Sequence, residues 1–395
     1  MDHRAHGDPT RHPPSLWADL AETLLLPAAF IYILLAANAV FDPSSDLRDF
    51  GAFYRSAIAW RNGSDLYAAS GTTFVVPNLN PPVFTVLFSP IAWFPVRDAL
   101  MIWWAVNIAA LVLTLILISR ELSLRPSRRM ILLGIAFAGT QAQLLLGQMA
   151  WVCMLLATLS WRAWRRERAF SAGLWLGVLI GLKPLFLLVL GVAALRRKRS
   201  LVLTALGTIL LTVLAGAFAC GWVAYTSWLQ AGGSVAWFRL FLNASVRGVL
   251  ARLADDGVAR PMWILASLTV TGAASWQLIR RASSPDRDLA VGFLTSLLVS
   301  PLGWVYYIPV ALGPLLVTLR GLQYRWWMLV GLASLFWPPG VAWGSPEEQL
   351  QRGLWNTLVG SLYAVGLFTL WWLALKEWRD RAAPSGARQD TLGVS

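Results

Sequence analysis

Long apolar segments separated by short arginine-rich breaks dominate the pattern of hydrophobic and polar positions. We place apolar segments at 20–40, 98–119, 130–145, 148–162, 170–182, 184–196, 200–222, 261–279, 288–301, 303–319, 326–337 and 354–375. A helix needs about 20 apolar residues to span a bilayer, so the longer segments are predicted to cross a membrane. The shorter ones meet at Gly147-Gln148, at Lys183-Pro184 and at Pro301–Gly303, where we predict broken helices that line a cavity.

A polar stretch, residues 49–67, follows the first apolar segment. Apolar side chains recur in it at helical spacing, at Phe50, Phe53, Tyr54, Ala57 and Trp60. This pattern predicts a short helix that lies in the membrane interface. An acidic cluster precedes and opens it: Asp42, Asp46 and Asp49. Residues 81–95, which begin with two prolines, are predicted as a re-entrant or interfacial helix.

Composition agrees with a membrane protein. The 395 residues are 57% hydrophobic and 13% charged, and the mean hydropathy is +0.58. We therefore predict an all-α polytopic membrane protein with about 11–13 transmembrane helices. The net charge of +13 is explained by topology, because the basic residues lie in the breaks between apolar segments, and no nucleic-acid partner is expected.

Arginine and lysine orient the chain, because cytoplasmic loops are enriched in them. We predict a disordered cytoplasmic tail at 1–18, a single transmembrane domain at 19–376 and a cytoplasmic tail at 377–395. The same rule places two loops outside the cytoplasm. Residues 41–80 form the first and contain the predicted interfacial helix, and residues 223–260 form the second. The three hinges fall on the same face as these loops. This convergence indicates one active site on the extracytoplasmic face.

The catalytic candidates are acids and cations. All three histidines lie in the first 12 residues, so a proton acceptor at that face must be an acid. Asp49 heads the predicted helix and is our candidate base, with Asp46 as the fallback; the alternative for Asp49 is a helix N-cap. Lys183, Arg247 and Arg252 are candidate phosphate contacts. Their alternatives are a snorkelling lysine and solvated loop charges.

A second group of residues offers sugar or acceptor contacts: Gln148, Asn243, Ser245, Tyr54, Trp304 and Tyr306. The alternative for Gln148 is hydrogen bonding between helices. The alternative for Trp304, Tyr306 and the adjacent Tyr307 is an aromatic belt at the interface. Asn243-Ala244-Ser245 also spells a glycosylation sequon. The two cysteines lie in apolar segments and are predicted to be packing thiols.

An ordered set of short motifs runs from about residue 45 to residue 310. It comprises Asp49-Phe50 with Phe53-Tyr54, Ala57, Gly63, Asp65 and Tyr67; Asn80-Pro81-Pro82, Ser89-Pro90 and Phe94-Pro95; Leu146-Gly147-Gln148; Ala172-Gly173, Gly177, Gly181-Leu182-Lys183-Pro184 and Arg196-Arg197; Asn243, Ser245, Gly248 and Arg252; and Ser300-Pro301 with Trp304. The set resembles the polyprenol-phosphate-dependent mannosyltransferases of glycosyltransferase family 87, a branch of the GT-C superfamily.

The resemblance implies a GT-C fold, a lipid-phosphate sugar donor, usually of mannose, and a first-loop Asp as base, which favours Asp49. The distribution of arginine and lysine, together with about twelve crossings, puts both termini in the cytoplasm, and we expect an integral protein of a bacterial plasma membrane. Two departures are visible. Gly303 stands where the family often has Ser, and Val305-Tyr306-Tyr307 stand where a His often follows. Met149-Ala150-Trp151 follow Gln148 where an Asn is usual.

The resulting hypothesis is an inverting transferase. Asp49 takes a proton from a hydroxyl of an extracytoplasmic glycolipid or glycan, whose oxygen attacks the anomeric carbon of a polyprenyl-phosphate sugar. No metal is required, because the chain has no Asp-x-Asp pattern and no glycine-rich phosphate loop, although Asp46 with Asp49 would suit a divalent ion. One alternative is a transporter or flippase of a lipid-linked sugar. Against it stand the one-sided polar groups and the absence of an inverted repeat; a purely structural membrane protein is the third possibility.

Overall fold

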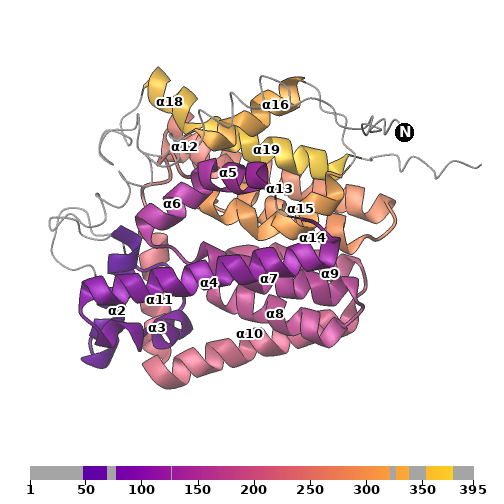
Figure 1. Ribbon diagram of the computed structural model, residues 1–395. Coiled ribbons are helices and arrows are strands. Elements are labelled where there is room, and N and C mark those ends of the chain that lie inside the picture. Colours follow the sequence, from indigo (N-terminus) through magenta and orange to yellow (C-terminus); the bar gives the residue numbers. More distant parts are fainter. Residues whose placement is uncertain (1–47, 69–76, 126, 321–325, 338–352, 377–395) are drawn as a thin grey trace, which may run out of the picture.

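The computed structural model describes residues 48–68, 77–125, 127–320, 326–337 and 353–376 (Figure 1). The predicted first span, Asp42, Asp46 and both predicted tails lie outside these residues. The described chain is helical, and its only β-type pairing is an isolated antiparallel bridge between Asn243 and Trp304. The prediction of an all-α protein is confirmed.

The helices form two packed layers (Figure 1). In one, α4 (Val96–Leu122), α7 (Ala150–Arg165), α8 (Ala169–Leu182) and α10 (Arg199–Cys220) pack in succession. The other holds α13 (Asp256–Arg280), α14 (Pro285–Val299), α15 (Leu312–Thr318) and α19 (Leu362–Leu375). The shorter elements complete the fold: α2 (Arg48–Arg61), α3 (Pro82–Phe88), η1 (Ile91–Trp93), α5 (Arg128–Ala136), α6 (Ala138–Leu146), η2 (Pro184–Phe186), α9 (Leu187–Leu195), α11 (Trp222–Gly233), α12 (Val246–Leu253), η3 (Val305–Ala311), α16 (Trp326–Ala333), η4 (Ser334–Phe336) and α18 (Leu354–Gly360).

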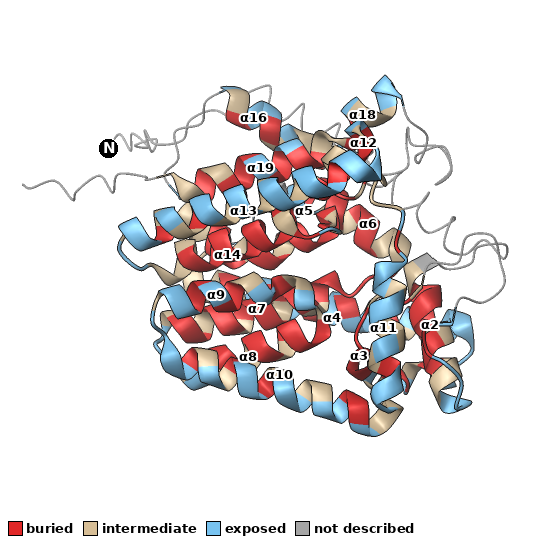
Figure 2. Ribbon diagram, turned by 180° about the vertical axis from the view of Figure 1, so that it is seen from behind, coloured by how far each residue is buried: buried red, intermediate tan, exposed pale blue. Residues whose placement is uncertain are grey.

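Exposed apolar side chains mark the chain as an integral membrane protein. Four helical segments of the described chain are long and apolar enough to span a bilayer: Val96–Leu122, Arg199–Cys220, Asp256–Arg280 and Leu354–Leu375. The outer surfaces of α10 and α13 expose leucines such as Leu203, Leu211, Leu265 and Leu268, whereas α14 is buried along most of its length (Figure 2). The predicted total of 11–13 spans stays a prediction.

Several element boundaries differ from the sequence prediction. The segment 130–145 is two helices, α5 and α6, separated by an extended Phe137. The predicted loop 223–260 contains helices α11 and α12 and the start of α13. Residues 81–95 form the short helix α3 and the turn η1, and α3 packs against α10. α2 spans most of the predicted interfacial helix, but its apolar side chains Phe50, Phe53 and Ala57 are buried against protein.

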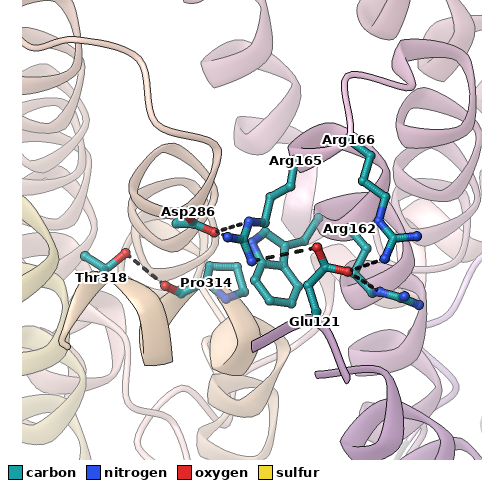
Figure 3. A network of polar contacts seen from close by, with 8 residues as sticks. Glu121, Arg162, Arg165, Arg166, Asp286, Pro314 and Thr318 are labelled. Atoms are coloured by element: carbon teal, nitrogen blue, oxygen red, sulfur yellow. Dashed lines mark hydrogen bonds and ion pairs between the residues drawn. The ribbon is translucent and has the colours of Figure 1, made fainter. Parts of the chain in front are cut away.

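The arginine-rich breaks after α4, α7 and α9 gather at one end of the bundle, near the start of α14. Glu121 at the end of α4 accepts hydrogen bonds from Arg162 Nε (3.0 Å) and Arg166 Nη2 (2.7 Å) near the end of α7 (Figure 3). Arg165 Nε lies 3.4 Å from an oxygen of Asp286 at the start of α14. These charges connect three helices that are far apart in sequence.

A second ion pair lies among the same breaks. Arg196, just after α9, forms a bidentate pair with Asp288 of α14, with N–O distances of 2.8 and 2.7 Å. The Gly147-Gln148 hinge lies at the opposite end of α7, whose 16 residues make a helix about 24 Å long. The bundle therefore has an arginine-rich end and a hinge end.

Candidate active site

The candidate base lies in the first turn of α2, at the hinge end. Asp49 is half-buried there, and a negative charge is favourable at a helix N-terminus. The helix is held by aromatic contacts, with the Phe53 ring centroid 4.9 Å from that of Phe84 and 6.5 Å from that of Trp103. Oδ2 of Asp49 accepts a hydrogen bond of 2.6 Å from Nε2 of Gln148. The structure therefore brings two of the predicted site residues into contact.

Gly147 explains how Gln148 reaches α2. Its φ is +62°, in the left-handed region that favours glycine. A Cβ at this position would lie 2.7 Å from Cβ of Phe50, the neighbour of Asp49. A side chain would therefore strain the turn and push α2 away from the hinge.

Two polar side chains fix the backbone of this hinge, and a third supports one of them. Trp103 Nε1 donates a 2.7 Å hydrogen bond to the carbonyl of Gly147. Gln143 donates to the carbonyl of Gln148 and accepts from the amide of Ala150 at 3.0 Å. Asn107 Oδ1 accepts from Gln143 at 3.1 Å. Sequence reasoning did not single out these three residues, although Asn107 and Gln143 are visible as polar positions inside apolar segments.

Tyr307 and Lys183 complete the cluster. The Tyr307 hydroxyl donates to Oε1 of Gln148 at 3.3 Å. Nζ of Lys183 lies 5.2 Å from the centroid of the Tyr307 ring, within the range of a cation–π interaction. The charges of Lys183 and Asp49 also attract each other. Four separate segments (α2, the α6–α7 hinge, the α8–η2 turn and η3) thus meet at one place.

Asn243 organises a second cluster, in the loop between α11 and α12. It is fully buried, and its Nδ2 donates to the carbonyls of Phe238 (3.0 Å) and Pro301 (2.9 Å). Its Oδ1 accepts from the amides of Gly303 (3.0 Å) and Ser245 (3.2 Å). This side chain ties the loop to the segment after α14, and it is not accessible to a glycosylating enzyme.

Ser245 and Arg252 form hydrogen bonds that stabilise the same loop. Ser245 caps α12, its hydroxyl accepting from the Gly248 amide at 3.2 Å. The Arg252 guanidinium donates to the carbonyls of Arg239 and Leu240 at 3.2 Å and to that of Asn243 at 3.3 Å. Burial lowers the pKa of Arg252 to about 9, so the guanidinium still carries its charge at neutral pH. Its hydrogen bonds hold the loop against α12.

Arg247 is buried on the same helix. Its guanidinium forms an ion pair with Asp256 and lies over the ring of Phe238, 4.6 Å from the centroid. Of the three predicted phosphate contacts, Lys183 is the one that lies beside the Asp49–Gln148–Tyr307 cluster. Arg247 and Arg252 are engaged within the second loop.

The comparisons with known proteins decide the family. Residues 78–301, more than half of the chain, match glycosyltransferase family 87. The chain belongs to this family. It is 26% identical over 359 residues to the polyprenol-phosphate-mannose-dependent alpha-(1-2)-phosphatidylinositol mannoside mannosyltransferase of Mycobacterium tuberculosis, covering 82% of each chain. The protein of the same description from Mycolicibacterium smegmatis is 26% identical over 368 residues, which cover 82% of this chain and 81% of the relative. No solved structure matches the chain.

Within this family 87 chain, the matched region includes Gln148, Lys183, Arg247 and Arg252 and leaves Asp49 and Tyr307 outside. The departure around Gly303 has a local explanation. A Cβ on Gly303 would lie 2.0 Å from the carbonyl oxygen of Leu297, so a serine here requires the backbone to shift. The position where the family often has a His falls within Val305-Tyr306-Tyr307. The hydroxyl of Tyr307 in this segment donates a hydrogen bond to Gln148.

Aromatic rings connect the two clusters of this family 87 chain. Trp304 stacks with Trp237 (centroids 6.3 Å apart) and with Tyr306 (6.1 Å), and Tyr306 contacts Tyr307 (4.8 Å). Tyr54, a further predicted contact, donates instead to the carbonyl of Phe94 at 2.9 Å. No group of three or more potential metal ligands occurs among the described residues, which exclude Asp46. Cys153 and Cys220 are unpaired thiols.

Proposed function

We propose that this chain is a polyprenyl-phosphate-mannose-dependent α-mannosyltransferase that glycosylates an extracytoplasmic glycolipid or glycan. Membership of family 87 supports glycosyl transfer over lipid transport. The names of both mycobacterial relatives support the donor, since each is described as polyprenol-phosphate-mannose-dependent. The observation that carries the mechanism is a connected cluster: the Asp49 carboxylate accepts from the Gln148 amide, Gln148 accepts from Tyr307, and the Lys183 ammonium lies over the Tyr307 ring.

Asp49 acts as the general base in the proposed reaction. It removes the proton of an acceptor hydroxyl while that oxygen forms a bond to the anomeric carbon of the donor. The bond between this carbon and the phosphate oxygen breaks, and its electron pair leaves with the polyprenyl phosphate. Attack opposite to the leaving group inverts the anomeric configuration, so a β-linked donor gives an α-mannoside. General base catalysis typically contributes about 10²- to 10⁴-fold to such a rate.

Lys183 stabilises the phosphate as it departs. An ammonium in a half-buried site interacts more strongly with a developing negative charge than one in bulk water, because less water screens it. Its position over the ring of Tyr307 also gives the cation a partner before the donor binds. Arg247 is a second candidate, since its Nη1 has no hydrogen-bond partner among the described residues. Arg252, whose guanidinium donates to loop carbonyls, is proposed to shape the site rather than to bind the donor.

The polarity of the bundle supports an extracytoplasmic reaction. The arginine-rich ends of α4, α7 and α9 lie opposite the hinge end, and cytoplasmic loops are the ones enriched in arginine. We therefore place Asp49 on the extracytoplasmic side, within a single transmembrane domain of residues 19–376. A transporter would instead need a polar site near the middle of the membrane with access from both faces.

Donor choice tests the proposed function. Washed membranes that contain the chain are supplied with labelled polyprenyl-phosphate mannose or with a labelled nucleotide sugar, together with a lipid extract as the source of acceptor. We expect label to pass to lipid or glycan from the polyprenyl donor alone. Transfer from the nucleotide sugar in membranes depleted of polyprenyl phosphate would overturn the proposal.

A further inference from the structure

The amide of Gln148 bridges two groups, and their chemistry fixes its orientation. An ionised carboxylate only accepts hydrogen bonds, so the amide nitrogen must face Asp49, as it does at 2.6 Å. The amide oxygen is then left to accept from the hydroxyl of Tyr307, at 3.3 Å. The hydrogen bonds therefore run in one direction, from Tyr307 through Gln148 to Asp49.

This bridge has little freedom to move. Tyr307 is fully buried and Gln148 is 6% exposed. The Gln148 backbone is fixed by Gln143, and the preceding carbonyl by Trp103. The Tyr307 ring packs edge-on against Phe186, with centroids 6.0 Å apart. Both polar ends of the amide are thus engaged by protein groups that are themselves held in place.

We infer that Gln148 and Tyr307 are positioning residues that set the orientation of the Asp49 carboxylate, rather than contacts to the sugar. This inference rests on the proposed function, in which Asp49 is the base. A hydrogen bond from a rigid donor holds a carboxylate in one rotamer, so the acceptor hydroxyl meets an oxygen that is already aligned. Tyr307 also carries Lys183 over its ring, so one side chain connects the base to the cation.

The bridge has a consequence for pH dependence. A donor that hydrogen-bonds to a carboxylate stabilises its charged form and lowers its pKa. Removing the amide of Gln148 should therefore raise the pKa of Asp49. Since the base works as the anion, the acid limb of the rate profile should move to higher pH. A residue that only contacts the sugar would not move this limb.

Two substitutions remove the bridge with little change in shape. Gln148→Met keeps the length of the side chain and removes both polar ends, and Tyr307→Phe keeps the ring and removes the hydroxyl. Tyr225→Phe is the matched control, since it removes a tyrosine hydroxyl that donates to the carbonyl of Val213 at 3.1 Å in α10. The full-length variants are purified in detergent, and elution profile and melting temperature show that each is folded.

The assay uses labelled polyprenyl-phosphate mannose as donor and phosphatidylinositol mannoside or a lipid extract as acceptor. A net hydrogen bond of about 0.5–1.5 kcal/mol corresponds to a roughly two- to twelvefold change in rate. We expect kcat to fall roughly threefold in Tyr307→Phe and roughly tenfold in Gln148→Met, with KM for the donor unchanged. The acid limb should move to higher pH in Gln148→Met and stay in Tyr225→Phe. Gln148→Asn, which is too short to span both partners, should behave like Gln148→Met.

A double-mutant cycle makes the test sharp. If the two residues act as one chain, Tyr307→Phe should have almost no further effect in a Gln148→Met background. Additive losses would overturn the inference, as would an unchanged pH profile with a raised KM, which is the behaviour of a substrate contact. A wild type that transfers no mannose would overturn the proposed function and the inference with it. If the wild type is active and the losses in kcat of the two single variants add up in the double variant, the inference is overturned and the proposed function is not.

Discussion

At the scale of single residues, the structure separates two cations by their partners: the buried Arg252 and the half-buried Lys183. Arg252 donates to loop carbonyls from Arg239, Leu240 and Asn243, so its charge is compensated by the fold. Lys183 is half-buried, its ammonium lies over the ring of Tyr307, and the charge of Asp49 attracts it, so its partners belong to the proposed site. Substitution should therefore affect stability in one case and activity in the other.

Replacing Lys183 tests the second half of this contrast. Lys183→Met keeps most of the side-chain volume and removes the desolvation cost of a half-buried charge, so the melting temperature should be unchanged or higher. The activity should fall roughly 10²- to 10³-fold, because the leaving phosphate loses its cation. Lys198→Met, an exposed lysine at the arginine-rich end, is the control. A Lys183→Met variant with wild-type kcat would remove Lys183 from the mechanism.

Replacing Arg252 tests whether its charge contributes to stability rather than to activity. Arg252→Lys keeps the charge but loses the planar fork that reaches several carbonyls at once. We expect a loss of roughly 2 kcal/mol in stability, the usual size for hydrogen bonds to a charged group, seen as a lower melting temperature in detergent. The KM for the donor should change little in the folded fraction. A stable variant whose donor KM rises tenfold would show instead that Arg252 binds phosphate.

At the scale of elements, the hinges position the site. The sequence pattern located the hinges at Gly147 and Lys183, because glycine, proline and isolated polar residues interrupt apolar segments visibly. It missed the break at Phe137, which has no such marker. There the Thr140 hydroxyl donates to the carbonyl of Gly134 at 2.6 Å, and side chains that bond to nearby carbonyls compete with helix continuation. The sequence prediction also missed helix α12. This helix is only eight residues long, and it and its N-cap Ser245 lie within the segment 223–260, which was predicted as one loop.

Gly147→Ala tests whether the α6–α7 hinge sets the geometry of the base. The new Cβ meets Cβ of Phe50 at 2.7 Å, and the left-handed turn adds roughly 1–2 kcal/mol of strain. We expect kcat to fall at least roughly tenfold, with a lower melting temperature. Gly191→Ala in α9 is the control, because its Cβ would meet no atom within 4 Å. Equal activity in the two variants would contradict the role given to the hinge.

At the scale of the whole molecule, the two ends of the bundle differ in chemistry. The family and the helical fold follow the sequence prediction, and the structure brings the candidate residues Asp49 and Gln148 into contact at one end. The hydrogen bonds of Asn243 and Arg252 were not predicted, because most of their partners are backbone amides and carbonyls. Spacing in sequence does not reveal which backbone groups approach a side chain. Tyr307 was visible only as one of several aromatics, since its contact with Gln148 spans 159 positions.

Side-specific labelling tests this polarity. In a background with Cys153→Ala and Cys220→Ala, single cysteines are introduced as Ser64→Cys at the hinge end and Arg168→Cys at the arginine-rich end, both at exposed positions. An impermeant maleimide added to intact cells should label Ser64→Cys alone. Inverted vesicles should label Arg168→Cys alone. Labelling of both positions from the same side would contradict the proposed orientation.

The most direct test of the central claim is mannose transfer by Asp49→Asn. Membranes with matched amounts of wild type, Asp49→Asn and the control Asp65→Asn receive labelled polyprenyl-phosphate mannose and a lipid extract as acceptor. Asp65 is an exposed residue of the same loop, whose carboxylate accepts from the amide of Tyr67 at 3.0 Å. If Asp49 is the base, its amide variant loses at least roughly 10²-fold in rate, and Asp65→Asn transfers like wild type. Transfer by Asp49→Asn at the wild-type rate would contradict the account.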